Sequence, residues 1–392
     1  MQRPAVVLGL RPGGLAVVRA LGRSGVSVAG IAFDAADIGF ASRYLTRRRR
    51  IAAPDGDAGD ERFLAVLADV ARAGRPVLYA ELDRPLELLL RRWDEIRAIA
   101  DVPLPDDPDV VRRLAAKDTL VEEATRAGVP IPRTVIARTA EDVHSASLQP
   151  PFLVKPVASE AYARRFGHKL VRARSLDDAS AAWRRAAAAG FDTVLQEEIP
   201  AYDRIFSLFT YIGRGGQSLA SVVGRKLRQI PPRFGTATVF RSEFEPRVLE
   251  LGQRLLSASD YRGFAHVEVA HDVRDDSFRL IEVNTRPPVW AGIGMTPDWN
   301  MAHVAHSDLS GEEPQPLGVL TRDVTWVYGV KDAFASAQLA RRGELGLSEA
   351  VAPYRAPRKV RAVLARDDPA PALALAAWAG LVGVRRAGGR KG

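Results

Sequence analysis

Short apolar runs alternate with stretches of helical periodicity through the first hundred residues of the chain. Apolar segments at Ala5–Leu10, Val26–Phe33 and Pro76–Ala80 are separated or followed by stretches with apolar positions at helical spacing, as in Pro85–Ile99. Continuous apolar runs of this length are typical of strands buried on both faces, and their alternation with helices is typical of a parallel sheet. The pattern predicts an α/β domain over residues 1–105.

The middle of the chain follows a different pattern, in which helices mix with hairpins. Helices are predicted over Asp109–Gly128, and the apolar strands Phe206–Ile212 and Leu219–Gly224 are joined by a glycine-rich turn. Weaker strand and helix signals and a final apolar segment follow. We therefore expect an α+β core over residues 106–315 and a small C-terminal extension over residues 316–392.

Composition narrows the functional classes. The chain has 392 residues, more than one ordinary hydrophobic core accommodates, and it has no cysteine. The absence of cysteine excludes disulfides, thiolate catalysis and Cys-ligated zinc, and it fits a cytoplasmic protein, as does the lack of a secretory signal. The net charge is +9, but the basic clusters at Arg47–Arg50 and 385–391 lack interleaved aromatic residues, so no specific nucleic-acid partner is expected.

A predicted hairpin carries the clearest chemical signal. Its strands run from Ala265 to Val273 and from Phe278 to Asn284. Side chains alternate between the two faces of a strand, so Glu268 lies on the face opposite Val267, and Glu282 and Asn284 share one face. Carboxylate and amide oxygens are ligands that Mg²⁺ prefers. The hairpin therefore predicts a site for a metal-bound nucleotide, and the alternative is the exposed polar face of a half-buried hairpin.

Two lysines and a linker add candidate phosphate and nucleotide contacts. Lys117 is at the start of a predicted helix, and Lys155 ends an apolar strand, so each ammonium must find an anion or water. The segment Gln196–Asp203 runs from a strand into a proline-broken linker, whose free backbone groups can pair with the edge of adenine. Asp203 is then placed to accept hydrogen bonds from ribose hydroxyls.

The order of these residues along the chain resembles that of a known superfamily. Lys117, Lys155, the linker 196–203, a basic strand at Gly224–Arg228 and then the carboxylate hairpin with Arg286 are similar in order and spacing to the ATP-grasp superfamily. The resemblance spans residues 106–313. The closest likeness is to D-aspartate-ligase-like carboxylate–amine ligases, through the segments 225–235 and 367–371.

This resemblance implies an architecture. A parallel-sheet, Rossmann-like domain over residues 1–105 would precede a two-lobed α+β ATP-grasp core. Residues 106–190 would form the first part with a small lobe, residues 191–315 the metal and phosphate lobe, and residues 316–392 a C-terminal extension.

The resemblance also implies roles for individual residues. Lys117 and Lys155 would contact ATP phosphates, and Arg286, Lys155 and Arg225 would be the catalytic residues, Arg225 by binding a substrate carboxylate. Backbone groups of Glu197 and Ile199 would meet adenine, and Asp203 the ribose. The implied ligands of one or two Mg²⁺ or Mn²⁺ ions are Glu268, Glu282 and Asn284.

The implied reaction is the ATP-dependent joining of a small-molecule carboxylate to an amine, or to a thiol, through an acyl phosphate, with release of ADP and phosphate. Three features depart from the superfamily pattern, one of them the turn Thr285–Pro288, where relatives have other residues. The loop Val157–Lys169 has few glycines, which leaves open a catalytically weak ATP-binding regulatory or scaffold protein. The segment Tyr79–Asp83 differs from the acidic motif expected there, so Glu81 and Asp83 are not counted among the site residues.

Two further alternatives rest on other segments. The turn Gly9–Gly14 with Asp34 resembles a dinucleotide fingerprint, but its glycines read GxxxGG, a weak match to the motif of nicotinamide-dependent oxidoreductases. The apolar segment and basic tail at 370–391 are compatible with peripheral contact to an anionic membrane, although packing of a helix on the protein's own core is the simpler interpretation.

Overall fold

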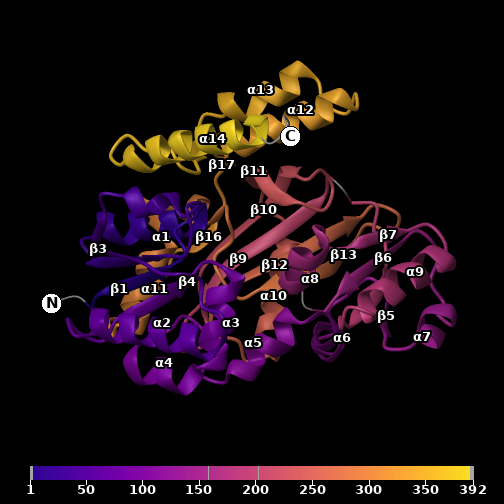
Figure 1. The fold of residues 1–392 in the computed structure, drawn as a ribbon, viewed down its shortest axis with the longest axis horizontal. Helices are drawn as coiled ribbons and strands as arrows, with labels where there is room; N and C mark the ends of the chain where they lie inside the picture. The colour runs from indigo at the N-terminus through magenta and orange to yellow at the C-terminus, as the bar shows by residue number, and fades with distance from the viewer. Residues whose placement is uncertain (1–2, 158, 202, 389–392) are drawn as a thin grey trace.

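The computed structural model describes residues 3–157, 159–201 and 203–388, so part of the basic tail expected at 385–391 and one residue of the 196–203 linker lie outside it (Figure 1). The first domain contains β1 (Ala5–Leu8), α1 (Pro12–Arg23), β2 (Val28–Ala32), η1 (Ile38–Ala41), β3 (Leu45–Arg50), α2 (Gly56–Ala71), β4 (Val77–Ala80), α3 (Asp83–Arg91) and α4 (Trp93–Ile99). Its strands are parallel in the order β3-β2-β1-β4, which confirms the predicted parallel sheet.

Two details of this domain differ from expectation. The basic cluster at Arg47–Arg50 belongs to the edge strand β3, whose last five residues are exposed. Charged side chains protect an edge strand from pairing with another chain, so a strand without apolar periodicity is physically reasonable there. The helix predicted over Pro85–Ile99 is two helices, α3 and α4, which meet at Arg92.

A small lobe follows, with its own sheet and core. After α5 (Pro108–Ala115) and α6 (Lys117–Arg126) come β5 (Thr134–Ala137), α7 (Ala140–His144), β6 (Phe152–Pro156), α8 (Ser159–Phe166), β7 (Val171–Ala173), α9 (Leu176–Ala187) and β8 (Thr193–Glu197). The four strands are antiparallel in the order β5-β8-β6-β7, and α7 and α9 pack on them around Phe152, Val154 and Leu195. The segment predicted as a glycine-poor loop contains helix α8.

The large sheet is built from β9 (Ile205–Ile212), β10 (Ser218–Ile230), β11 (Thr236–Ser242), β12 (Gly263–Asp272) and β13 (Ser277–Asn284), with β16 (Gly318–Leu320), β17 (Thr325–Val327) and β18 (Lys359–Arg361) from the C-terminal part. Its order is β13-β12-β9-β10-β11-β17-β18, and β16 pairs with β10. Helices α6 and α10 (Pro246–Ala258) cover one face, where Leu208, Val267 and Leu255 share a buried cluster. The opposite face is the one that carries the candidate site.

The remaining elements are η2 (Ala291–Gly294), β14 (Met295–Thr296), β15 (Trp299–Asn300), α11 (Met301–Leu309), α12 (Gly329–Arg341), α13 (Leu347–Arg355) and α14 (Ala370–Gly388). One hydrophobic cluster contains Leu15 of α1, Phe209 of the large sheet, Trp290 and Trp326, so the first domain, the sheet and the C-terminal part share a core. In Figure 1, α12, α13 and α14 lie together along one side of the molecule. The domain boundaries at residues 105 and 315 stay predictions.

The segment before α14 is anchored to the first domain. Asp368 is fully buried and accepts hydrogen bonds from Arg19 Nε (2.8 Å) and Ser42 Oγ (2.7 Å). Pro371 and Leu375 of α14 are buried, whereas Leu373 and Trp378 are exposed. Within the described ranges, no helix combines the length and apolar character needed to cross a membrane.

Candidate functional site

The hairpin β12–β13 forms as predicted and fixes the register of its polar side chains. Glu268 lies opposite Glu282, and His266 lies opposite Asn284. These four side chains therefore share one face, since partners in an antiparallel pair and residues two apart point the same way. Val267 is fully buried on the other face. Because the Glu268 side chain is only 15% exposed, the alternative of an exposed polar surface does not describe this face.

A buried ion pair occupies part of this face. Lys226 Nζ of β10 donates to Glu268 Oε2 at 2.7 Å, across the intervening strand β9. Burial raises the pKa of Glu268, but the charge and hydrogen bond of Lys226, together with His266 and Lys169, outweigh burial, and the pKa is lowered overall. Burial also lowers the pKa of His266 to about 4, so this imidazole is neutral at pH 7. Glu268 is therefore an anion held by Lys226.

Glu282 differs from Glu268 in having no such partner. Its side chain is half-buried at the end of β13, and within the part of the chain that the structure describes it makes no hydrogen bond or ion pair. Lys155 and Arg286 lie close enough for Glu282 to raise the pKa of each. A half-buried carboxylate without a bonded partner among the described residues is suited to bind a cation that arrives with a substrate.

Lys155 brings a cation from the small lobe to these carboxylates. It is 7% exposed on β6, and its Nζ donates to Gln196 Oε1 at 2.5 Å. Burial lowers the pKa of Lys155 to about 8, repulsion by Lys117 adds to this, and Glu282 and Glu268 oppose it. The Lys155 ammonium therefore lies near enough to the carboxylates of the large sheet to feel their charge.

Lys117 belongs to the same group. It is the first residue of α6, and its Nζ donates to Ser159 Oγ, the first residue of α8, at 2.6 Å. The structure therefore brings Lys117 and Lys155 together with Glu268 and Glu282, although their sequence separations reach 165 residues (282 − 117). Cations of the small lobe thus lie near anions of the large sheet, and their roles as phosphate and metal contacts stay predictions.

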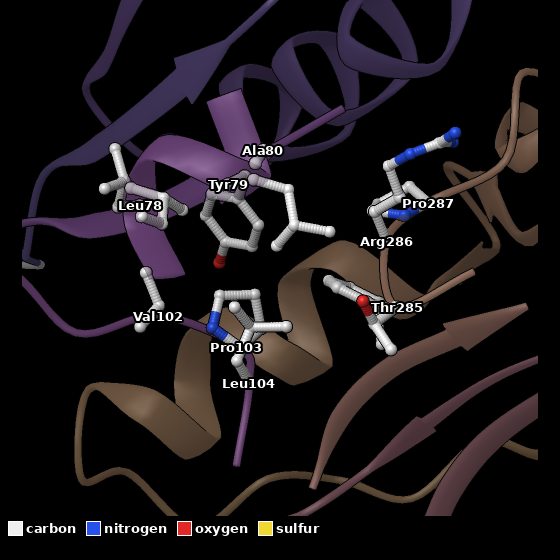
Figure 2. Close-up of a pocket in the computed structure, with 12 residues that line it drawn as sticks. Leu78, Tyr79, Ala80, Val102, Pro103, Leu104, Thr285, Arg286 and Pro287 are labelled. Carbon is white, nitrogen blue, oxygen red and sulfur yellow. The ribbon is translucent and has the colours of Figure 1, made fainter. Parts of the chain in front are cut away.

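Arg286 approaches the group from the turn after β13. Its Nε donates to Asp83 Oδ1 at 2.5 Å. Burial lowers the pKa of Arg286, but the negative charges of Asp83, Glu81 and Glu282 outweigh burial and raise this pKa overall. The guanidinium therefore stays charged. Figure 2 shows the Arg286 side chain extending away from Tyr79, out of a small apolar pocket. That pocket is lined in part by Leu78, Tyr79, Pro103, Leu104, Thr285 and Pro287.

Asp83, which is not among the predicted site residues, lies close to several of them. Burial raises its pKa, but the charges of Arg286, Lys169 and Lys117 lower it overall. Asp83 thus faces cations from three separate segments. No local pattern identifies it, because its partners are 34 to 203 residues away (117 − 83 and 286 − 83).

The linker after β8 leads away from Lys155. Glu197 Oε1 accepts from Arg133 N (2.9 Å) and Arg279 Nη1 (3.0 Å), and the Glu197 N–H donates to the Arg133 carbonyl. The Ile199 carbonyl accepts from Ala201 N at 2.8 Å. Several polar groups of the linker are thus already bonded within the protein. Adenine recognition by Glu197 and Ile199 stays a prediction.

Asp203, the proposed ribose contact, is exposed, and its carbonyl accepts from Arg225 Nη1 at 3.1 Å. Arg225 itself lies on the wrong face of the large sheet for the catalytic role predicted for it. Arg225 is paired with Phe206 of β9, and Phe206 is paired with the buried Val269 of β12. Residues paired in register point to the same face, so Arg225 lies on the face opposite Glu268. Its Nε donates to Glu243 Oε2 at 3.2 Å. The next residue, Lys226, points to the opposite face and donates to Glu268.

The glycine turn after β1 is explained by close packing. A Cβ on Gly14 would lie 2.1 Å from the Gly9 carbonyl oxygen, and a Cβ on Gly13 would lie 2.9 Å from Glu81 Oε1. The Gly13 N–H donates to the Glu81 carboxylate, so an acidic side chain already occupies the N-terminus of α1, where a dinucleotide fingerprint binds pyrophosphate. Asp34 is paired with Arg11. This geometry argues against a nicotinamide cofactor in the turn.

The carboxylates fit a metal ion that is shared with a substrate. Among the residues that the structure describes, no group of three or more His, Cys, Asp or Glu side chains could hold a metal ion by itself. Mg²⁺ is usually bound by one or two carboxylates together with substrate phosphates and water, and Glu282 and Glu268 with Asn284 are compatible with that mode. Their role as ligands stays a prediction.

Comparisons with known proteins identify the fold. No model of a protein family matches the chain, and no curated protein sequence matches it. Many solved structures do, among them N5-carboxyaminoimidazole synthetase from Staphylococcus aureus complexed with ADP, which is 12% identical with a TM-score of 0.65 over 88% of this chain and 87% of that one. Biotin carboxylase from Campylobacter jejuni is 15% identical, with a TM-score of 0.63 over 79% of this chain and 71% of that one.

A third similar structure is L-amino acid ligase from Bacillus licheniformis, 16% identical with a TM-score of 0.59 over 79% of this chain and 75% of that one. These likenesses cover 79% to 88% of this chain, and they show the fold alone.

Proposed function

We propose, from the ATP-grasp fold that the chain shares with these structures, that it is an ATP-dependent ligase that joins a carboxylate to an amine. The observation that carries the proposal is the proximity of Lys155, from the small lobe, and of Arg286 to Glu282 of the large sheet, a carboxylate that has no bonded partner among the described residues. A cation–anion pair split between two lobes suits a substrate that carries both phosphates and a metal ion.

Each residue then has a distinct task. Lys117 and Lys155 bind the phosphates of ATP, and Glu282, Glu268 and Asn284 hold Mg²⁺ against them. When bound there, such an ion would supply positive charge that neutralises the phosphates. Lys226 keeps Glu268 ionised and oriented, because the pair is bonded at 2.7 Å before any ligand binds.

The reaction proceeds in two steps. A carboxylate oxygen attacks the terminal phosphorus of ATP, the bond to ADP breaks, and an acyl phosphate forms. Arg286, held by Asp83, stabilises the negative charge of the transferring group. An amine then attacks the carbonyl carbon and phosphate leaves. No enzyme nucleophile is required, which agrees with a chain that contains no cysteine.

One assay tests this function. The purified chain is incubated with MgATP, a pool of amino acids and other small carboxylates, and a pool of amines. We expect ADP release that depends on the carboxylate, together with a new amide detected by mass spectrometry. Release of AMP, or failure to bind ATP, contradicts the proposal. ATP binding without turnover across the pool supports the regulatory alternative instead.

The lowered pKa of Lys155 predicts proton uptake on nucleotide binding. In the free protein burial holds this pKa at about 8, so above pH 8 the amine is mostly neutral. Phosphates favour the charged form, so binding raises the pKa and the protein takes up a proton. The affinity for a non-hydrolysable MgATP analogue should therefore fall as pH rises from 8 to 9.5, by at most about tenfold per pH unit.

Titration calorimetry at pH 7 and pH 9, in buffers with different ionisation enthalpies, measures this uptake directly. The matched control is Lys155→Met, which removes the titrating group and should remove the difference in proton uptake between the two pH values. An unchanged proton count in the wild-type chain would show that Lys155 does not sense the phosphates.

A further inference from the structure

Glu81 occupies the position at which α/β sheets bind ligands. It directly follows β4, and the Gly9–Gly14 turn directly follows β1. In the sheet order β3-β2-β1-β4, the strands β2 and β3 lie on one side of β1, and β4 lies on its other side. The order in which the chain adds strands therefore reverses between β1 and β4. Ligands of such sheets bind outside the carboxyl ends of the strands at this reversal.

The Glu81 side chain is buried with half of its carboxylate unused. It is 5% exposed, and one side of the group accepts the Gly13 N–H. Its Oε2 has no hydrogen-bond partner among the described residues, and the same holds for the buried Nε of Arg11. Buried polar atoms are nearly always bonded, so an acceptor and a donor left free at one location indicate a ligand with groups of both kinds.

Charged groups surround Glu81 from several elements. Arg286, on the turn after β13, and Arg11, before α1, both lower its pKa, while Asp37 raises it. The negative charge of Glu81 also acts to raise the pKa of Tyr328 and of Lys331, in the C-terminal part. Lys331 Nζ lies 5.3 Å from the centre of the Tyr328 ring. Because burial outweighs the neighbouring cations, the pKa of Glu81 is raised to about 7.

We propose that Glu81 Oε2 binds the ammonium group of the acceptor substrate and takes its proton as the amine attacks the acyl phosphate. This role rests on the proposed ligase function and adds to it, since it places the acceptor at the first domain, close enough to Arg286 for that guanidinium to lower the pKa of Glu81. Arg11 and Lys331 would repel an acceptor with no negative charge. The acceptor class is therefore a primary amine that also carries an anionic group, as an amino acid does.

The step balances in atoms and charge. The ammonium transfers one proton to Glu81, and the lone pair that this frees forms the C–N bond to the acyl carbon. The C–O bond to phosphate breaks, and the phosphate leaves with the electron pair and takes the second proton from nitrogen. The third hydrogen stays on the amide, and Glu81 returns its proton to water.

Hydroxylamine distinguishes the role of Glu81 in deprotonating the acceptor from the formation of the acyl phosphate. Hydroxylamine is mostly unprotonated at neutral pH, so it traps acyl phosphates as hydroxamates without a base. With the carboxylate that gives the most ADP in the pool assay, Glu81→Gln should lose ligation to amino acids at pH 7 by about 100-fold or more. Hydroxamate formation should change less than threefold. Ligation by the variant should then rise up to tenfold per pH unit between pH 7 and 9, as the free amine becomes available.

The matched control is Glu250→Gln, an exposed substitution on α10, and thermal unfolding checks that Glu81→Gln is folded. A second measurement needs no variant: wild-type ligation should fall below pH 7 while hydroxamate formation persists. The acceptor class is checked by comparing each amino acid with its decarboxylated amine, of which the amino acid should be preferred.

The outcomes are distinct. Equal losses of ligation and hydroxamate formation in Glu81→Gln, or no loss of ligation, overturn the role of Glu81 while the ligase function stands. If the wild-type chain forms neither hydroxamate nor ADP with any carboxylate, the ligase function itself fails, and the role of Glu81 fails with it.

Discussion

Replacing Glu282 by alanine should lower carboxylate-dependent ADP release by about 100- to 1000-fold, the usual effect of removing one group that stabilises charge at a reaction centre. Glu282 lies opposite Glu268 in the hairpin and faces Lys155 and Arg286 without being bonded to either. Its carboxylate is therefore free to hold the metal ion. Because it is only half-buried and makes no ion pair with any residue that the structure describes, its removal should leave stability nearly unchanged.

Steady-state ADP release at saturating substrates measures the effect, and denaturant unfolding confirms the intact fold. Glu250→Ala, on the exposed side of α10, is the matched loss of one carboxylate far from the site and should leave turnover within twofold of wild type. Raising the Mg²⁺ concentration should restore part of the Glu282→Ala activity. A variant that retains more than a third of wild-type turnover would show that Glu282 is not a metal ligand.

The hairpin could be predicted because its evidence is local. Alternation between Val267 and Glu268 fixes which face each side chain takes, and an antiparallel partner a few residues away fixes the register. Lys155 was recognisable for a related reason, as a charged residue at the end of an apolar strand. In both cases a charged residue occurs among apolar residues of a strand, and a short window of sequence is enough to show it.

Other parts of the site depend on contacts that no short window contains. Glu81 and Asp83 can be recognised as candidate site residues only from their proximity to Arg286, about 200 residues later, and, for Glu81, from the hydrogen bond with the turn before α1. Arg225 and Lys226 are adjacent basic residues, and only the register with β9 shows which one meets Glu268. The strand β3 escaped detection because an exposed edge needs no apolar periodicity.

Breaking the Lys226–Glu268 pair from one side should be far more costly than removing both partners. The side chains are 9% and 15% exposed, so Glu268→Gln leaves the Lys226 ammonium buried without its counter-ion. We expect Glu268→Gln and Lys226→Met each to lower the free energy of unfolding by about 3 kcal/mol, whereas the double variant should recover most of that loss. Urea unfolding of the four proteins without nucleotide gives the coupling energy.

The exposed pair Glu245–Arg247 provides the comparison, because its ion pair at 3.0 Å has an arginine that is 49% exposed. Water screens that pair, and its coupling energy should be below about 1 kcal/mol. Additive losses in the Lys226–Glu268 cycle would mean that the two groups are solvated independently. A large coupling instead shows that Lys226 holds Glu268 ionised before a metal arrives, which is the condition under which Glu268 and the free Glu282 can bind the ion together.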